Sequence, residues 1–228
     1  VIPCYNESKN IPLILEKFSN VINRNDIEIL LVNNGSTDDS HEVLNNLLPK
    51  YNFARVITLK NNRGYGYGIL SGLNEARGEL IGYTHADMQT DPEDPIKALE
   101  IMENYQDYNN YFIKGDRKGR PLFDQLFSTA MSFFETIYLK TKLWDINAQP
   151  NVFHRSFFED IKDNCPEDFS LDLYFLFMAN LKGLNIVRFD VMFPERTYGE
   201  SKWNTGIANK WKFIKRTLEF SFKLKKKL

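Results

Sequence analysis

Strand and helix signals alternate along the first half of the chain, and this alternation constrains the fold more than any other feature. A short apolar segment at residues 1–3 is followed by helical spacing of apolar residues over 10–22 and by a continuous apolar run at 27–32. A capped helix to about residue 48, a strand at 55–59, a helix at 68–77 and a strand at 79–84 come next. This order predicts a mostly parallel sheet with helices on both faces.

The second half has the same elements in a less regular order. We expect helices near residues 91–105, 122–139, 157–163 and 171–181, strands near 111–114, 152–153 and 185–193, and a last helix from about residue 206. The length of 228 residues suits one domain with an appendage. We therefore expect a main domain over residues 1–205 and a basic amphipathic helix over 206–228. Val1 and Ile2 have the pattern of the end of a buried strand, so we expect the native first strand to begin upstream.

The polar loops after the strands are the expected ligand site, because open α/β sheets bind ligands at the carboxyl ends of their strands. Tyr5 and Glu7 follow the first strand and suit contacts with a base and a ribose, although Glu7 would equally cap the next helix. Asn34 follows the second strand and offers a side-chain amide, in a sequence that is also an ordinary turn before a helix. Each loop alone is a weak signal.

The segment after the fourth strand contains His85, Asp87 and Gln89. Strand alternation would point these three side chains the same way, and carboxylate and amide oxygens are ligands for Mg²⁺ or Mn²⁺. Such an ion would neutralise a departing diphosphate. The alternative is an acidic turn before a helix.

A general base is required only if the acceptor is a hydroxyl group, because a phosphate acceptor is already an anion. The candidates are Asp145 and Asp172. The alternatives for both are structural, namely an exposed loop carboxylate and a helix-capping acid.

Two helices have patterns that allow either packing or surface contact. The helix at 122–139 has one apolar side, which we expect to face the core, and a second apolar side that could contact a lipid or a partner. The first side consists of Leu122, Leu126, Ala130, Phe133, Phe134 and Ile137. The second side consists of Phe123, Phe127, Met131 and Tyr138.

The net charge of −1 argues against nucleic acid as a partner. The last 19 residues hold eight Lys or Arg and one Glu, and mix them with aromatics as membrane-surface helices do.

The glycines at 64, 66 and 68 superficially suggest a dinucleotide-binding fingerprint. Counted from Gly64, the third glycine should be residue 69, which is Ile69, and counted from Gly66 it should be residue 71, which is Ser71. An NAD enzyme is therefore a poor alternative.

Four blocks together resemble glycosyltransferase family 2, which includes dolichyl-phosphate mannosyltransferase and bacterial polyprenyl-phosphate sugar transferases. The blocks read VIPCYNE (1–7), LLVNNGSTDDS (30–40), NNRGYGYGILSGLNEARGELIGYTHADMQTDPED (61–94) and ERTYGESKW (195–203). Their order and spacing make the resemblance specific and extend it over nearly the whole chain. It implies an α/β, mostly parallel, Rossmann-like nucleotide-binding sandwich of the GT-A type, with an acceptor-side extension.

The resemblance also implies roles for individual residues. The nucleotide pocket would be lined by Pro3, Tyr5, Glu7, Asn34 and Gly64. The metal would be held by Asp87 and Gln89, with His85 where the family usually has Asp. The phosphates would be faced by Arg117, Arg196, Ser201 and Lys202. Where polyprenyl-phosphate transferases tend to have another Arg shortly after Arg117, this chain has Arg120.

The implied activity is an inverting transfer of a sugar from a nucleotide-diphosphate sugar to a cell-surface glycan or to a polyprenyl-phosphate or other lipid-linked acceptor, assisted by Mg²⁺ or Mn²⁺. The implied location is cytoplasmic and peripheral on the inner face of the membrane, with surface contact through the basic C-terminal end. The competing classes are a nucleotide-sugar-binding module that has lost catalysis and a membrane-associated scaffold. The family does not select a sugar, base or acceptor.

Overall fold

The computed structural model describes residues 1–194 and 207–226. Its strands are β1 (Ile2–Cys4), β2 (Ile29–Asn34), β3 (Ala54–Leu59), β4 (Leu80–Tyr83), β5 (Tyr111–Lys118), β6 (Asn151–His154) and β7 (Asn185–Met192). Its α-helices are α1 (Asn10–Val21), α2 (Ser40–Leu47), α3 (Tyr65–Glu75), α4 (Glu93–Glu103), α5 (Leu122–Leu139), α6 (Arg155–Ile161), α7 (Leu171–Leu181) and α8 (Ile207–Lys226). Short 3-10 turns lie at Leu48–Lys50, Tyr108–Asn110 and Lys162–Asn164.

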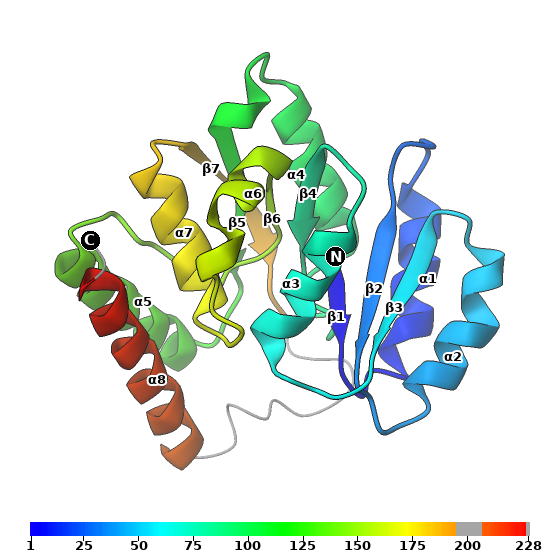
Figure 1. Cartoon of the computed structure of the whole chain (residues 1–228), viewed down its shortest axis with the longest axis horizontal. Coiled ribbons are helices and arrows are strands. Elements are labelled where there is room, and N and C mark those ends of the chain that lie inside the picture. Colours follow the sequence, from blue (N-terminus) through cyan, green and yellow to red (C-terminus); the bar gives the residue numbers. More distant parts are fainter. Residues whose placement is uncertain (195–206, 227–228) are drawn as a thin grey trace.

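The strands form a parallel sheet in the order β1-β2-β3 and a mixed sheet in the order β4-β6-β5-β7. β6 runs antiparallel to both β4 and β5, whereas β5 and β7 are parallel. Two backbone hydrogen bonds join the sheets, because the Val1 nitrogen donates to the Gly82 carbonyl at 2.8 Å and the Thr84 N–H donates to the Val1 carbonyl at 3.1 Å. β4 therefore lies beside β1, and the strands follow one another across the molecule (Figure 1).

Helices cover both faces of these strands. On one face, Leu73 of α3, Phe158 of α6 and Phe175 of α7 share an apolar core with β4, β5 and β6. On the other face, α1 and α2 pack on β1 and β2, and Met102 of α4 packs on β5 and β6. The three-layer α/β arrangement predicted from the alternation is confirmed. The antiparallel β6 was not expected.

Most predicted helices and strands are present with bounds shifted by a few residues, and the bounds of α5 and α7 match the prediction. α3 differs, because it begins at Tyr65 rather than near residue 68. Gly64 precedes it with a φ of 118°, which an L side chain rarely adopts. The glycines at 66 and 68 are therefore helical.

The predicted core face of α5 is wrong. Leu122, Leu126, Phe133, Phe134 and Ile137 are exposed, and we refer to these five residues as the apolar stripe of α5. The side of α5 that faces the protein includes the buried Ser132, Glu135 and Leu139. Apolar spacing shows that a helix has an apolar side, but it does not show whether another element covers it.

α8 lies along α5 at one end of the molecule (Figure 1). Ser221 donates to Oε2 of the buried Glu135 at 2.7 Å, and the rings of Tyr138 and Phe222 meet edge to face at 5.2 Å. Lys225 donates to the Tyr138 carbonyl at 2.8 Å. These contacts join the two helices into one surface. In the described part of the chain, no helix is long and apolar enough to cross a membrane.

Candidate active site

The loops after β1 and β2 are bound to each other. The Asn6 N–H donates to Ser36 Oγ at 3.1 Å, and the Thr37 N–H donates to Asn6 Oδ1 at 2.8 Å. The Glu7 N–H donates to Ser40 Oγ at 3.0 Å. These bonds hold the loops that contain the predicted nucleotide-pocket residues against each other at the carboxyl ends of the two strands.

Glu7 accepts hydrogen bonds from the first residues of α1. Its carbonyl accepts from the N–H groups of Asn10 at 2.9 Å and Ile11 at 3.0 Å, and its carboxylate accepts from the Asn10 amide at 2.6 Å. Helix N-termini leave backbone N–H groups that need such acceptors. The N-cap of α1 is Lys9, with no side-chain cap bond and no acid in the first turn, so Glu7 precedes the helix and only its backbone carbonyl meets these N–H groups. Its predicted contact with a nucleotide stays a prediction.

Asn34 connects the end of β2 to the residue before α3. Its Nδ2 donates to the Gly64 carbonyl at 2.9 Å, and a Cβ on Gly68 would lie 2.9 Å from that same nitrogen and 3.3 Å from Pro3 Cβ. Three predicted pocket residues, Pro3, Asn34 and Gly64, are thus brought together. The bond from its Nδ2 couples the Asn34 side chain to the position of residue 64.

The segment after β4 bends rather than continuing as a strand. β4 ends at Tyr83, and Met88 has a φ of 59°. The argument from strand alternation therefore does not apply to His85, Asp87 and Gln89. Asp87 is buried and accepts the Gln89 N–H at 3.1 Å, and the Gln89 amide donates to the Pro194 carbonyl at 3.1 Å.

The donor set in this segment fits a metal ion that takes few ligands from protein. Within residues 1–194 and 207–226, no three His, Cys, Asp or Glu side chains gather as a metal cluster. Mg²⁺ characteristically binds one or two carboxylates and completes its coordination with substrate phosphates and water. The buried Asp87 carboxylate suits that pattern, whereas the His85 imidazole two residues earlier is a nitrogen ligand, which Mg²⁺ does not prefer.

Arg117 and Asp145 form a buried ion pair between β5 and the segment before β6. The Arg117 N–H donates to Asp145 Oδ2 at 3.0 Å, and its Nε donates to Oδ1 at 3.0 Å, with a further bond from its terminal nitrogen. Burial raises the pKa of Asp145, but Arg117 outweighs this effect and holds the pKa below its ordinary value. Asp145 is therefore a buried anion bound to Arg117, and the exposed-loop alternative is wrong.

Two more arginines lie around this pair. An Arg120 terminal nitrogen is 3.9 Å from Asp145 Oδ1 and donates to Ser128 at 2.7 Å, while Arg120 Nε is buried with no hydrogen-bond partner among the described residues. Arg188 donates to the Gly115 carbonyl at 3.2 Å. Burial lowers the pKa of both Arg120 and Arg188. Asp116 acts on both of these arginines as well, and Asp124 acts on Arg120, so carboxylates and guanidinium groups are mixed at this place.

Asp172 lies in the first turn of α7 and is 3% exposed. Tyr65 donates to its Oδ2 at 3.1 Å, and Tyr83 donates to its Oδ1 at 2.8 Å. Gln149 in turn donates to the Tyr65 hydroxyl. Both oxygens of Asp172 are therefore bonded to tyrosines from distant parts of the chain.

Aromatic rings connect these groups across the site. The rings of Tyr65 and His85 are 6.4 Å apart, those of His85 and Phe193 are 6.3 Å apart, and the Arg117 guanidinium lies 5.2 Å from the Phe193 ring centre. His85, Arg117, Asp145 and Asp172 thus belong to one connected region. Sequence reasoning missed Tyr65 and Phe193, because the first drew notice only as part of a glycine-rich run and the second as a strand end.

A fully buried lysine supports the same region and was also missed. Lys114 donates to the Ala148 carbonyl at 2.5 Å and to Asn151 Oδ1 at 2.9 Å, and burial lowers its pKa to about 7. It thereby anchors the segment that contains Asp145 and Gln149. A lysine in a strand gives no sequence signal for burial, because lysine is usually exposed.

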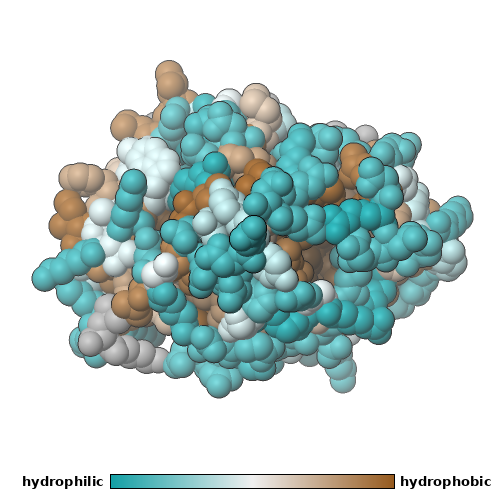
Figure 2. All heavy atoms as spheres, turned by 90° about the horizontal axis from the view of Figure 1, so that it is seen from above, coloured by the Kyte–Doolittle hydropathy of each residue, from teal (hydrophilic) through white to brown (hydrophobic). Residues whose placement is uncertain are grey.

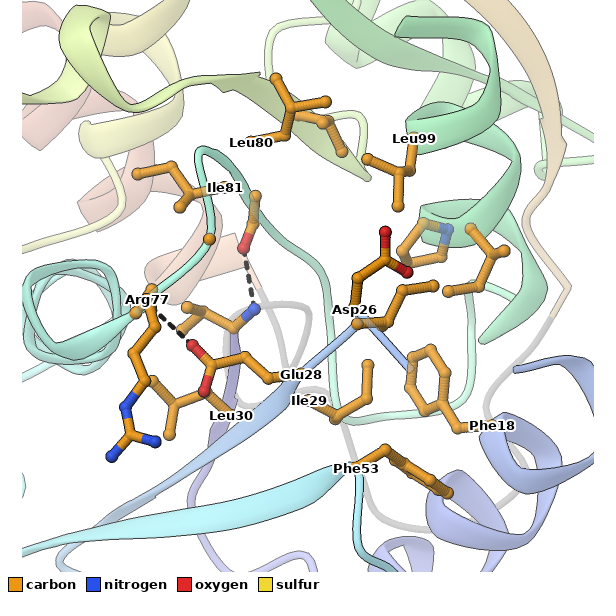
Figure 3. A pocket seen from close by; sticks show the side chains of 18 of the residues that line it. Phe18, Asp26, Glu28, Ile29, Leu30, Phe53, Arg77, Leu80, Ile81 and Leu99 are labelled. Atoms are coloured by element: carbon orange, nitrogen blue, oxygen red, sulfur yellow. Dashed lines mark hydrogen bonds between the residues drawn. The ribbon is translucent and has the colours of Figure 1, made fainter. Parts of the chain in front are cut away.

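Three predicted phosphate-facing residues, Arg196, Ser201 and Lys202, lie outside the described residues. A pocket of about 710 Å³ lies at the opposite, amino ends of the strands, lined by residues such as Phe18, Ile29 and Leu80 (Figure 3). Its lining contains none of the predicted site residues. We therefore do not place the active site there.

Comparison with known proteins agrees with the fold. Residues 1–162 match the model of the glycosyl transferase family 2. An undecaprenyl-phosphate 4-deoxy-4-formamido-L-arabinose transferase from Photorhabdus laumondii is 28% identical over 211 residues, which are 90% of this chain and 62% of that protein. A dolichol-phosphate mannosyltransferase from Pyrococcus furiosus is 27% identical over 208 residues, covering 89% and 58%. The chain thus spans about 60% of the length of these relatives.

Solved structures show the same fold. Glucosyl-3-phosphoglycerate synthase from Mycobacterium tuberculosis, in complex with UDP, superposes with a TM-score of 0.69 at 15% identity, covering 92% of this chain and 74% of that one. A mannosyltransferase from Pyrobaculum calidifontis, in complex with GDP-mannose and Mn²⁺, gives a TM-score of 0.65 at 18% identity, covering 86% and 57%. With the loops, the fold and the family match in agreement, this chain belongs to glycosyl transferase family 2.

Proposed function

We propose that this chain transfers a sugar from a nucleoside-diphosphate sugar to the phosphate of a polyprenyl-type lipid, with inversion at the anomeric carbon. An acceptor phosphate oxygen forms the new bond to the anomeric carbon while the bond from that carbon to the donor diphosphate breaks. The nucleoside diphosphate leaves with the electron pair. No proton has to be removed from the acceptor.

One observation supports a phosphate acceptor above all: the carboxylates of both candidate bases are buried and hydrogen-bonded to other side chains. Asp172 and Asp145 are 3% and 5% exposed, and all four of their carboxylate oxygens accept hydrogen bonds from Tyr65, Tyr83 or Arg117. A general base must reach the proton that it removes. Neither carboxylate is well placed for that role, and a phosphate anion does not require it.

The arginines beside Asp145 favour the same acceptor. Arg117 is bonded to Asp145, but Arg120 beside it has a buried Nε with no partner among the described residues, and guanidinium groups bind phosphate oxygens through such N–H donors. Of the residues outside the described ranges, Arg196 and Lys202 would add cations for the donor diphosphate, and Ser201 would add a hydroxyl.

Asp87, with His85 and Gln89, would hold Mg²⁺ or Mn²⁺. When bound, the ion would neutralise charge on the leaving diphosphate. These side chains would position that ion, and the loops after β1 and β2 would bind the nucleoside. The relatives named above that act on undecaprenyl phosphate and dolichol phosphate support a lipid-linked acceptor for this chain.

The surface formed by α5 and α8 suits an anionic bilayer. α8 packs on α5 through Glu135 and Tyr138, and the apolar stripe of α5 stays exposed. α8 exposes Trp211 and Phe222 together with Lys215, Lys223 and Lys226. Seen from above, apolar side chains gather with polar ones at the end of the molecule where α5 and α8 lie (Figure 2). Apolar side chains beside lysines match the acyl and headgroup layers of such a membrane. We propose that the protein lies peripherally on the cytoplasmic face, where this surface would meet the acceptor.

Transfer assays with matched acceptors test the proposal. Purified protein with Mn²⁺ and UDP, GDP or CDP sugars is supplied with either a polyprenyl phosphate or the corresponding alcohol. We expect transfer to the phosphate only, with an inverted anomer in the product. Transfer to the alcohol or to a glycan hydroxyl, or retention of configuration, would contradict the proposal.

A pair of variants separates catalysis from mere nucleotide-sugar binding. Asp87→Asn removes one charge and keeps an acceptor for the Gln89 N–H, whereas Asp91→Asn removes an exposed charge four residues later, from an ion pair with Lys17. We expect Asp87→Asn to lose at least 100-fold in kcat/KM and Asp91→Asn to stay near wild type. A protein that binds a donor without transfer or slow donor hydrolysis would be a binding module instead, and one that binds vesicles but no donor would be a scaffold.

A further inference from the structure

Two segments about 100 residues apart are tightly joined beside the site. We call residues 61–68 the glycine segment and residues 165–170 the pre-α7 segment. The Tyr67 N–H donates to the Glu167 carbonyl at 2.9 Å, and the Arg63 guanidinium pairs with the Glu167 carboxylate at 2.8 Å. Arg63 also lies over the Tyr67 ring, 3.9 Å from its centre.

Glycine permits this close approach of two backbones. A Cβ on Gly66 would lie 2.6 Å from the Asp168 carbonyl oxygen, and one on Gly64 would lie 3.1 Å from the Glu167 carbonyl oxygen. Atoms of a real side chain do not fit at the first of these distances. The glycine at 66 therefore serves contact between two parts of the protein.

Tyr65 is the residue through which the two segments meet the interior. Its ring stacks on Phe169 with centres 4.6 Å apart and planes 5° apart. Its hydroxyl donates to Asp172 and accepts from Gln149. Burial, followed by the negative charge of Asp172, raises the pKa of Tyr65 well above its ordinary value, so the hydroxyl remains a donor.

Tyr65 also adjoins residues that are expected to line the nucleotide pocket. Its neighbour Gly64 accepts the Asn34 amide at 2.9 Å, and Asn34 ends β2 at the mouth of the expected nucleotide pocket. A fixed Tyr65 ring therefore fixes the Gly64 carbonyl and, through it, the Asn34 side chain. Without the hydroxyl bonds, the start of α3 loses its hydrogen bond to Asp172 of α7 and keeps only its contacts with the pre-α7 segment.

We propose that Tyr65 is a positioning residue for the nucleotide pocket, and that Asp172 serves to hold its hydroxyl. The inference rests on the proposed function in one respect, namely that the ligand of this pocket is a nucleoside diphosphate. Tyr65 acts through Gly64 and Asn34.

The chain contains a matched control for the test. Tyr65→Phe and Tyr83→Phe each delete one hydroxyl that donates to Asp172, at 3.1 Å and 2.8 Å. Only Tyr65 adjoins Gly64, while Tyr83 lies in β4 with its ring against Phe175. Tyr65→Phe also removes the acceptor of the Gln149 amide, so it should lose somewhat more unfolding free energy in urea than Tyr83→Phe. Binding of UDP, GDP and CDP with Mn²⁺ is then measured by calorimetry, with no acceptor present.

We expect Tyr65→Phe to raise the Kd of the preferred nucleoside diphosphate about 5- to 15-fold, and Tyr83→Phe to change it less than 2-fold; the range corresponds to loss of about one hydrogen bond. In transfer assays the loss should appear in the KM of the donor more than in kcat. Equal Kd values for the two variants would overturn the inference. A wild-type protein that binds none of the three nucleotides would overturn the proposed function as well.

A second pair of variants covers the case in which Tyr65→Phe does not fold. Arg63 and Glu167 are about half exposed, so exchanging their charges should leave the fold intact. We expect Arg63→Glu to weaken nucleotide binding 2- to 4-fold and the double variant Arg63→Glu/Glu167→Arg to restore most of it. Failure of the double variant to restore binding would contradict a role for this contact in positioning the pocket.

Discussion

The apolar stripe of α5 yields a prediction whose size follows from exposure. Leu126, Phe133 and Ile137 are 69%, 66% and 61% exposed. Full burial of such a side chain is worth about 1.5–3 kcal/mol, so two thirds of each is worth about 1–2 kcal/mol. Changing all three to Gln should therefore remove about 3–6 kcal/mol of bilayer affinity. At about 1.4 kcal/mol for each tenfold change, this is a loss of at least about 100-fold.

The assay is co-sedimentation with phosphatidylglycerol vesicles over a range of lipid concentrations. The triple variant should keep the melting temperature within a few degrees, because exposed substitutions usually change stability by less than about 0.5 kcal/mol each. A folded triple variant that sediments like wild type would refute the reasoning, since the stripe would then contribute nothing to lipid binding.

The lysines of α8 allow a second test of vesicle binding, with a charge-matched control elsewhere on the protein. Lys223→Glu/Lys226→Glu should weaken vesicle binding by several kcal/mol, because each lysine near an anionic surface contributes about 1 kcal/mol and each reversal adds repulsion. Lys50→Glu/Lys60→Glu makes the same change in net charge on exposed lysines near β3, far from α5 and α8 (Figure 1). Equal losses for both pairs would mean that net charge, rather than this surface, determines binding.

Three further predictions concern stability. Asp145→Asn should cost about 3–5 kcal/mol of unfolding free energy in urea, because it leaves Arg117 buried without its anion, and a cost below about 1 kcal/mol would contradict the buried pair. Burial raises the pKa of Glu135 from 4.5 to about 7, so the folded state binds more protons than the unfolded state between these pH values. The unfolding free energy should therefore fall as pH rises through that range. Glu135→Gln should flatten this dependence in melting curves, and an unchanged slope would exclude Glu135 as its source. Gly66→Ala should cost at least about 2 kcal/mol because its Cβ would meet backbone at 2.6 Å, whereas Gly183→Ala, with open space around it and a φ of 75°, should cost about 1 kcal/mol; equal costs would contradict the close packing at residue 66.

Local patterns in the sequence were sufficient for the elements and the fold class. The bounds of α5 and α7 match the predicted ranges, and the order of strands and helices in the first half predicted the α/β layers. Helix and strand periodicity depends on backbone geometry and on neighbours within a few positions, so a sequence displays it directly. The polar loops that follow the strands likewise predict a ligand site at the carboxyl ends of the strands.

Tertiary structure alone decided which surfaces are covered and which polar groups meet. The stripe on α5 has the spacing of a core helix, yet no described element covers it. Asp145, a candidate base with an exposed loop carboxylate as the alternative, is buried against Arg117, 28 residues away. Tyr65 reaches Asp172 across 107 positions, and the antiparallel β6 lies between β4 and β5. Burial and pairing of this kind depend on how distant segments pack together. Local propensity and residue spacing describe only neighbours along the chain, so they do not predict such contacts.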